Sequence, residues 1–134
     1  MAAANTALYD AFEAGDIDLM GAVWLDDDGV VCVHPGSPPV RGRGAVLRSW
    51  SVIMANTTYI QFVLTDVQVQ VTGDTAVVTC GENMLTGLPV TEADPTPGLA
   101  GGRAVATNVF RRTPSGWRLL VHHASPVLAG GEQE

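Results

Sequence analysis

One carboxylate in this sequence stands in an otherwise apolar line. In the stretch "TAVVTCGENML", which is typical of a β-strand, alternate side chains share a face, so Glu82 lies on the same face as Val78, Cys80 and Met84. A carboxyl group buried without a counter-charge has a raised pKa and can act as a general acid or base. The alternatives are a salt-bridged structural group, or a solvated carboxylate beyond the covered part of the sheet.

Three histidines could act together with this acid. His34 ends a short predicted strand just before Pro35, where it could form an acid/base pair with Glu82 or cap the turn. His122 and His123 are adjacent in another predicted strand, so their side chains point to opposite faces. Only one of these two can therefore face an interior.

We expect the inward or structurally anchored histidine to be His123. It shares a face with the more continuously apolar set, which consists of Trp117, Leu119 and Val121, whereas His122 falls on the face that carries an arginine. The spacing alone leaves open whether that apolar face meets an interior or a dimer interface.

Other side chains are candidates for holding a ligand. Asn108 lies between apolar neighbours on a predicted strand, where it could donate to a carbonyl oxygen, orient the carboxylate or only satisfy backbone groups. Trp50 lies on the apolar stripe of a predicted helix and is a candidate cavity wall, with core packing as the alternative. The predicted substrate-binding residues are Asn108, Trp50, Cys80, Met84 and Phe110.

The sequence contains no pattern typical of a metal or cofactor site. It has no short-range His-x-His or His-x-x-x-His pair, and adjacent histidines in one strand diverge, so we expect no metal. It also has no Gly-x-Ser-x-Gly nucleophile elbow, no phosphate-cradling glycine loop and no Cys-x-x-Cys pair. We therefore expect no cofactor.

Three helices are predicted in the first half of the chain. Residues 5–14 place apolar side chains on one helix face, and Gly15 ends that pattern. Asp16 is typical of an N-cap for a second helix over residues 17–24. The strongest helical stripe runs from Val46 to Met54.

A short strand is predicted from Val30 to His34, and from Thr57 onward the pattern is that of strands. In "TYIQFVLTDVQVQVTGD" the apolar positions are even at first and odd later, which indicates a bulge or bend in a curved sheet. "TGD" and "TPSG" predict hairpin turns, and the segment 86–102, rich in Gly and Pro, predicts a long loop. This order predicts an α+β fold with the helices gathered on one face of a bent sheet.

Composition limits the class of protein. The 134 residues predict a single domain, with residues 128–134 as a flexible tail. The formal net charge of -7 argues against a nucleic-acid partner, and no stretch approaches the ~20 apolar residues of a membrane-spanning helix. No secretory signal pattern opens the chain, and Cys32 and Cys80 are expected as buried free thiols rather than a disulfide, so we expect a cytoplasmic protein.

Three stretches, "VVCVHPG", "RGRGAVLRSWSVI" and "TNVFRRTPSGWRLLVHHASP", resemble the SnoaL-like branch of the nuclear transport factor 2-like superfamily over residues 5–127. The resemblance implies a cone, or cystatin-like roll, in which a curved, mainly antiparallel sheet wraps around three helices and leaves an apolar pocket. It also implies that Asn108 neighbours Glu82, that His123 belongs to a recurrent His-x-Ser ending, and that the chain forms a homodimer through the outer face of the sheet.

The superfamily includes polyketide cyclases, ketosteroid isomerases, dehydratases and the association domains of calmodulin-dependent kinases, so function has to come from the pocket residues. We expect a cofactor-independent isomerase, cyclase or dehydratase that acts by proton transfer on an apolar carbonyl or ring compound. Glu82 would be the acid or base, and His34 and His123 would be its partners. The sequence departs from the cyclases and isomerases in having no inward Asp. The alternative is a non-catalytic ligand-binding or association module.

Overall fold

Within the described residues, three helices form where the sequence predicts them. The computed structural model describes residues 1–88 and 98–128. The helices are α1 (Ala2–Ala14), α2 (Ile17–Val23) and α3 (Arg43–Ala55). Helix α1 ends at Gly15, whose φ of 63° is a left-handed conformation that glycine adopts without strain. Asp16 caps α2 by accepting hydrogen bonds from the backbone N–H groups of Asp18 and Leu19, so both predicted boundaries are confirmed.

In the described part of the chain, six strands form one mixed, mostly antiparallel sheet. They are β1 (Val31–Val33), β2 (Val40–Arg41), β3 (Ile60–Thr72), β4 (Thr75–Leu88), β5 (Gly98–Thr113) and β6 (Gly116–Pro126). Their order is β2-β1-β6-β5-β4-β3, in which β1 runs parallel to β6 and the other neighbouring pairs are antiparallel. The predicted α+β fold is confirmed.

The hairpin of β4 and β5 extends further than the sequence predicts. Both strands continue into the segment 86–102 that was expected as a loop, because β4 runs to Leu88 and β5 begins at Gly98. Residues 89–97, and residues 129–134 of the expected tail, lie outside the described residues. The two-residue strand β2 is too short to show an alternating pattern, so it was not predicted.

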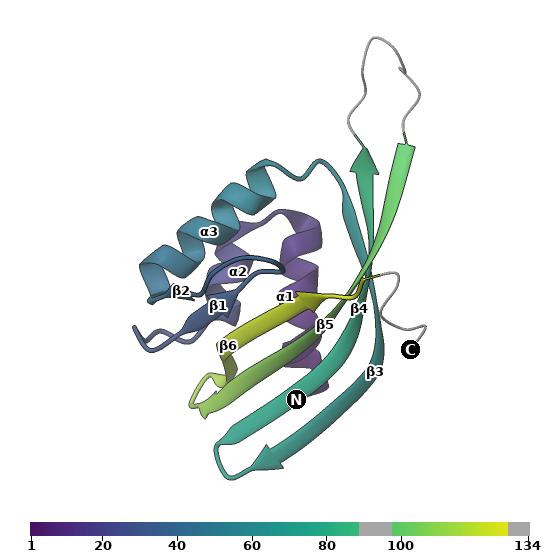
Figure 1. The fold of residues 1–134 in the computed structure, drawn as a ribbon. Helices are drawn as coiled ribbons and strands as arrows, with labels where there is room; N and C mark the ends of the chain where they lie inside the picture. Colours follow the sequence, from purple (N-terminus) through teal and green to yellow (C-terminus); the bar gives the residue numbers. More distant parts are fainter. Residues whose placement is uncertain (89–97, 129–134) are drawn as a thin grey trace.

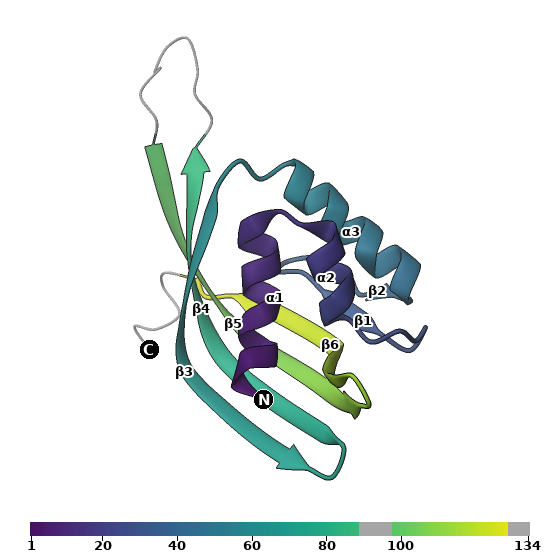
Figure 2. The same cartoon turned by 180° about the vertical axis from the view of Figure 1, so that it is seen from behind.

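The helices cover the concave side of the sheet (Figures 1 and 2). Figure 2 shows α1 against the long strands, with α2 and α3 beside it toward β1 and β2. The long strands bend, and β4 and β5 run away from helix α1 toward Leu88 and Gly98 in both views. The concave side of the sheet is called the inner face below, and the opposite side the outer face.

A bulge explains the change of apolar parity along β3. Between the pairs Thr65–Gly81 and Gln68–Thr79, β3 has one more residue than β4. Residues before and after this point therefore return to the same face: Leu64 pairs with Glu82 on the inner face, and Val69 pairs with Val78, also on the inner face. The predicted bulge is confirmed.

A second bulge, which the sequence analysis did not predict, lies in β6. Phe110 of β5 pairs with Leu119, but the preceding residue Val109 pairs with Val121, so Leu120 is an extra residue. Side chains on opposite sides of the bulge change parity, and Leu119 and His122 both face inward.

The core fills the space between α1, α2 and the sheet. Its largest fully buried apolar side chains come from several elements and include Leu8, Met20, Trp24, Phe110 and Leu119. Cys32 and Cys80 are buried free thiols, as expected. Among the described residues, no helix is both long enough and apolar enough to cross a membrane.

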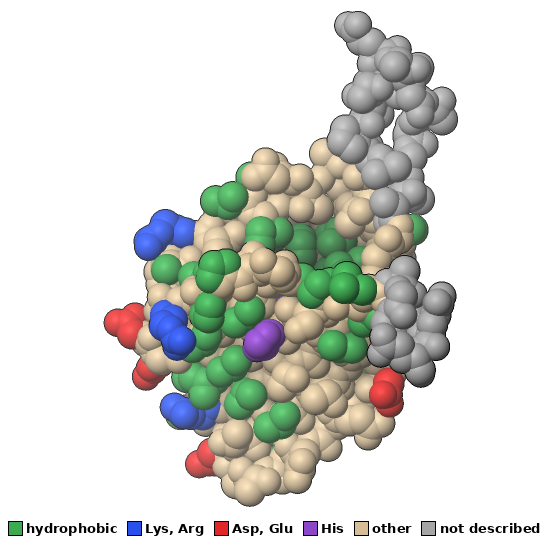
Figure 3. Space-filling view, viewed as in Figure 1, with side chains coloured by type: hydrophobic (Ala, Val, Ile, Leu, Met, Phe, Trp, Pro, Cys, Tyr) green, Lys and Arg blue, Asp and Glu red, His purple; other side chains and the backbone are tan. Residues whose placement is uncertain are grey.

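The outer face carries few charges at its centre. Figure 3 shows it with apolar and uncharged side chains around one histidine, and with basic and acidic side chains toward the margins. Val63, Val77 and Val105 are exposed on this face. The same view shows a hollow with apolar side chains at its base, between α3 and the strands.

Candidate functional site

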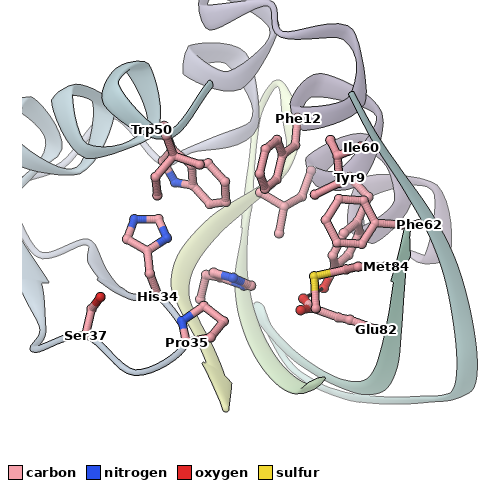
Figure 4. A pocket seen from close by; sticks show the side chains of 13 residues that line it. Tyr9, Phe12, His34, Pro35, Ser37, Trp50, Ile60, Phe62, Glu82 and Met84 are labelled. Carbon is pink, nitrogen blue, oxygen red and sulfur yellow. Dashed lines mark hydrogen bonds between the residues drawn. The ribbon is translucent and has the colours of Figure 1, made fainter. Parts of the chain in front are cut away.

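A cavity of about 340 Å³ lies between the inner face of the sheet and helices α1 and α3 (Figure 4). This volume is within the range of sites that hold small organic ligands. Its lining is mostly apolar and aromatic. The lining residues are Leu8, Tyr9, Phe12, His34, Pro35, Ser37, Trp50, Ile53, Ile60, Phe62, Glu82, Met84 and His122.

Glu82 and Tyr9 form the polar group on one wall. Glu82 is 4% exposed, and its Oε2 accepts a hydrogen bond of 2.6 Å from the Tyr9 hydroxyl. Burial raises the pKa of the Glu82 carboxyl above its ordinary value, and the hydrogen bond from Tyr9 opposes part of that rise. Within residues 1–88 and 98–128, Oε1 of Glu82 has no hydrogen-bond partner. The site therefore contains a buried carboxyl group with a free oxygen, which suits proton transfer.

Asn108 supports Tyr9 from the core side of the cavity wall. It is fully buried, and its Nδ2 donates to Asn5 Oδ1 at 2.8 Å and to the Tyr9 hydroxyl oxygen at 3.2 Å. Its Oδ1 lies 2.6 Å from Nδ1 of His122. The implied position of Asn108 beside Glu82 is wrong, because Glu82 pairs with Ala104 and the two side chains are linked only through Tyr9. Asn108 orients groups that line the cavity and is not itself among the lining residues.

His122 is the inward histidine, and the expectation that His123 takes this role is wrong. His122 is 3% exposed and lines the cavity, whereas His123 is exposed on the outer face. The physical reason is the bulge at Leu120, which reverses the parity extrapolated from Trp117. Burial, with smaller contributions from His34 and His123, lowers the pKa of His122 from 6.5 to about 3.

His34 lies across the cavity from Glu82 (Figure 4), so the two do not form a direct pair. Its Nε2 is 3.0 Å from the Ser49 hydroxyl oxygen, and the sulfur of Cys32 is 3.5 Å from the same nitrogen. Burial lowers the pKa of His34. The ring packs edge-on against Trp50 with centroids 4.7 Å apart.

Aromatic rings shape the rest of the cavity. Phe12 packs edge-on against Trp50 at 5.2 Å, and Tyr9 packs edge-on against Phe62 at 5.0 Å. Trp50 therefore lines the cavity as predicted, and its buried indole N–H has no hydrogen-bond partner in the part of the chain that the structure describes. Met84 also lines the cavity as predicted.

Besides Asn108, two more of the predicted substrate-binding residues lie outside the lining. Phe110 is fully buried in the core, because its position opposite Ala76 places it under the helices and away from the opening. Cys80 is 4% exposed and its sulfur lies 3.7 Å from the Tyr9 hydroxyl, which separates it from the cavity. Both expectations of a direct ligand contact are corrected accordingly.

Sequence reasoning missed Tyr9 and His122. Tyr9 was assigned only to an apolar helix face, although a buried tyrosine hydroxyl needs a partner, and the polar Asn5 one turn earlier marks the same face. These signals could have indicated a polar cluster behind the helix. His122 was missed because the bulge in β6 has no glycine or other local marker in "WRLLVHH".

Among the described residues, the cavity lining includes one acid and two histidines but no lysine or arginine. Among the described residues, no three His, Cys, Asp or Glu side chains are grouped so that they could hold a metal ion. The arrangement can move a proton at Glu82 and can hold a ligand between aromatic walls.

The sequence model of the SnoaL-like domain matches residues 1–129. The chain belongs to the SnoaL-like family. The crystal structure of a candidate dehydratase of the NTF2-like family from Streptomyces avermitilis is 55% identical to this SnoaL-like chain, covers 96% of it and 94% of the other chain, and superposes with a TM-score of 0.88. The resemblance drawn from the sequence is thus confirmed.

A second solved structure is a candidate calcium/calmodulin-dependent protein kinase type II association domain from Thiobacillus denitrificans. It is 35% identical, covers 95% of this chain and 94% of its own, and has a TM-score of 0.78. The F-box protein SKIP8 of Arabidopsis thaliana is 24% identical over 129 residues, which are 96% of this chain and 50% of that protein. The SnoaL-like chain thus spans about half the length of this curated relative.

Proposed function

We propose that this SnoaL-like protein is a cofactor-independent enzyme that transfers a proton on an apolar carbonyl or ring compound, in an isomerisation, cyclisation or dehydration. One observation carries the proposal: Glu82 is buried in an apolar cavity with a raised pKa and is hydrogen-bonded to Tyr9. A carboxyl group with a raised pKa exchanges protons nearer to neutral pH.

Each group has a distinct role in this proposal. Glu82 gives or takes the proton through Oε1, and Tyr9 stabilises the ionised form through its hydrogen bond to Oε2. Asn108 positions Tyr9 and His122. Trp50 and Phe12 hold the ring of the ligand and exclude water. Similarity to the candidate dehydratase favours dehydration among the three reactions.

The test uses a panel of ring ketones and β-hydroxy ketones in deuterated water. Mass spectrometry detects both exchange of hydrogens next to the carbonyl and loss of water. We expect Glu82→Gln to lower the rate by about 10²–10⁴. Asp28→Asn, which removes an exposed carboxylate, is the matched control and should keep the rate. A panel in which no compound reacts, or a Glu82→Gln variant with the rate of the wild type, overturns the proposal.

A second candidate, a non-catalytic association module, is favoured by the 35% identity to the candidate association domain. Under that proposal the cavity is leftover volume, so no panel compound reacts or raises the melting temperature while self-association persists. One experiment therefore distinguishes the two candidate functions.

Both candidates fit a homodimer formed through the outer face, which we propose as the assembly. Val63, Val77 and Val105 are 60%, 36% and 53% exposed there, and burying them between two copies would remove apolar area from water. Val105→Glu should convert the dimer to a monomer in light scattering. Val52→Glu, on helix α3 and 61% exposed, is the control that should leave the mass unchanged. A monomeric wild type at all concentrations contradicts this assembly.

A further inference from the structure

The hydrogen bonds around His34 fix which of its nitrogens carries the proton. The Ser49 hydroxyl has one hydrogen, and it donates this to the backbone oxygen of Val46 at 2.6 Å. Ser49 can therefore only accept from His34, so Nε2 of His34 carries the proton in the contact of 3.0 Å. The other nitrogen, Nδ1, keeps its lone pair, and its contact with Cys32 is a weak one at 3.9 Å to sulfur.

His122 is fixed in the opposite form. Tyr9 donates its hydroxyl hydrogen to Glu82, so its oxygen accepts from Nδ2 of Asn108. This orients the Asn108 amide with Oδ1 toward His122, and Nδ1 of His122 must then carry a proton to donate across 2.6 Å. Nε2 of His122 keeps its lone pair and has no hydrogen-bond partner within residues 1–88 and 98–128.

These two rings make one wall of the cavity an acceptor surface. His34 and His122 both line the cavity and both pack against Trp50, with ring centroids 4.7 and 5.8 Å from that of Trp50. Figure 4 shows His34 and Trp50 on one side of the cavity and the Tyr9–Glu82 pair on the other. Within residues 1–88 and 98–128, no lysine or arginine lines the cavity to compensate the charge of an anionic ligand.

We propose that the cavity selects an uncharged ring compound with a hydroxyl group that donates to Nε2 of His122, while a second oxygen function at its other end meets Glu82 and Tyr9. This inference rests on the proposed function, since it names the substrate class of the same site. Asn108 acts as a positioning residue, because it sets the tautomer of His122 without lining the cavity.

Burial supports a recognition role for His122. Its pKa is lowered to about 3, so the ring stays neutral and keeps its acceptor nitrogen across the physiological range. The same low pKa makes it a weak base for removing a proton from carbon. Proton transfer thus remains with Glu82, and His122 recognises the hydroxyl.

The first test needs no ligand. Nitrogen-15 NMR of the imidazole rings in the wild-type protein distinguishes the two neutral tautomers and the charged form. With three histidines in the sequence, assignment requires only single-residue variants. We expect His122 protonated at Nδ1 alone and His34 at Nε2 alone at neutral pH. A charged His122, or one protonated at Nε2, overturns the proposal.

The second test compares three probes that share the acetophenone ring and differ in the para substituent: para-hydroxyacetophenone, para-methoxyacetophenone and para-acetylbenzoate. Binding is measured by calorimetry at a pH where the phenol is neutral. We expect the hydroxyl compound to bind about tenfold more tightly than the methoxy compound, the equivalent of one hydrogen bond to a buried acceptor, and the carboxylate to bind most weakly. Equal affinities, or no binding by any probe, overturn the ligand class.

Variants separate this inference from the proposed function. His122→Phe should abolish the preference for hydroxyl over methoxy. Asn108→Asp should also abolish it, because a carboxylate beside Nδ1 favours the charged ring, and Nε2 then donates to a hydroxyl oxygen or a methoxy oxygen alike. A preference that survives His122→Phe contradicts the inference. Glu82→Gln should remove the reaction and leave the hydroxyl preference in place, so failure of catalysis and failure of recognition give different results. The wild-type NMR result stands even if a variant does not fold.

Discussion

The inner face of the long strands is filled at one end and hollow at the other. At the closed end, Ala76 and Val78 of β4 and Phe110 of β5 are fully buried against the helices. A few residues further along the same strand, Glu82 and Met84 border a cavity of about 340 Å³. One strand pair thus contributes packing at one end and a ligand site at the other.

A polar layer marks the boundary between these two ends. Asn108 pairs across from Val78 and links Asn5, Tyr9 and His122 in one hydrogen-bonded cluster. Because these buried groups satisfy one another, the cluster can border the apolar core at low cost. The closed end then supplies the stability that permits a buried acid and an open cavity nearby.

The largest expected effect comes from a substitution at the closed end. Phe110→Ala should lower the free energy of unfolding by about 3–5 kcal/mol, because it leaves a cavity among fully buried side chains. Met84→Ala at the open end should cost about 1 kcal/mol, since water can occupy the space it vacates. Urea denaturation of both variants measures the difference. Equal losses would contradict the distinction between a filled and a hollow end.

The next largest effect is expected from a substitution in the polar layer between the two ends. Asn108→Leu keeps the side-chain size but leaves the Nδ1–H of His122 and the Oδ1 of Asn5 without their partner. We expect a loss of about 2–3 kcal/mol in the free energy of unfolding. Asn83→Leu, on the outer face of β4, is the control and should cost less than about 1 kcal/mol. Similar losses in the two variants would mean that the buried cluster contributes no more to the stability of the fold than an outer-face hydrogen bond does.

Acid should also destabilise the folded protein through His122, which belongs to the polar layer. The unfolded chain binds a proton at His122 near the ordinary pKa of 6.5, whereas the folded protein binds it only near pH 3, so acid favours the unfolded state in that window. From pH 7 to pH 4 this group should remove about 3 kcal/mol of stability. His122→Gln should flatten that part of the pH profile in urea titrations. An unchanged slope in the variant would show that His122 is not the responsible group.

The closed end was predicted from the sequence more fully than the open end. Helix spacing, the Gly15 and Asp16 boundaries and the bulge in β3 each depend on neighbours in sequence, and these predictions are confirmed. At the open end, local pattern was enough only for Glu82, His34, Trp50 and Met84, which strand alternation and the helix stripe placed at the cavity.

The open end depends on contacts between distant segments. The Tyr9–Glu82 hydrogen bond joins residues 73 positions apart, and no local pattern predicts which strand residue a helix tyrosine will meet. The inward position of His122 depends on one extra residue in β6, which reverses the faces of all residues after it. The alternation of apolar and polar residues cannot indicate such an extra residue here, because consecutive positions before the histidines carry Leu or Val.

The smallest expected effect sharpens the comparison at Glu82 itself. Because burial raises the pKa of this carboxyl above 4.5, the folded protein binds its proton more tightly than the unfolded chain does. The free energy of unfolding should therefore fall as the pH rises from the ordinary carboxyl range through the raised value in the folded state, which is opposite in sign to the effect of His122.

Glu82→Gln should abolish that decline, so the variant gains stability relative to the wild type as the pH rises from the ordinary carboxyl range through the raised pKa of Glu82. Tyr9→Phe removes the hydrogen bond that lowers the pKa of Glu82, so the decline should move to higher pH. This move should be small, because burial has the larger influence on that pKa. Urea titrations at matched ionic strength measure both profiles, with Asp28→Asn as the exposed control. A parallel profile for Glu82→Gln and the wild type would mean that the carboxyl is hydrated in the folded state, and the open end would then hold no buried acid.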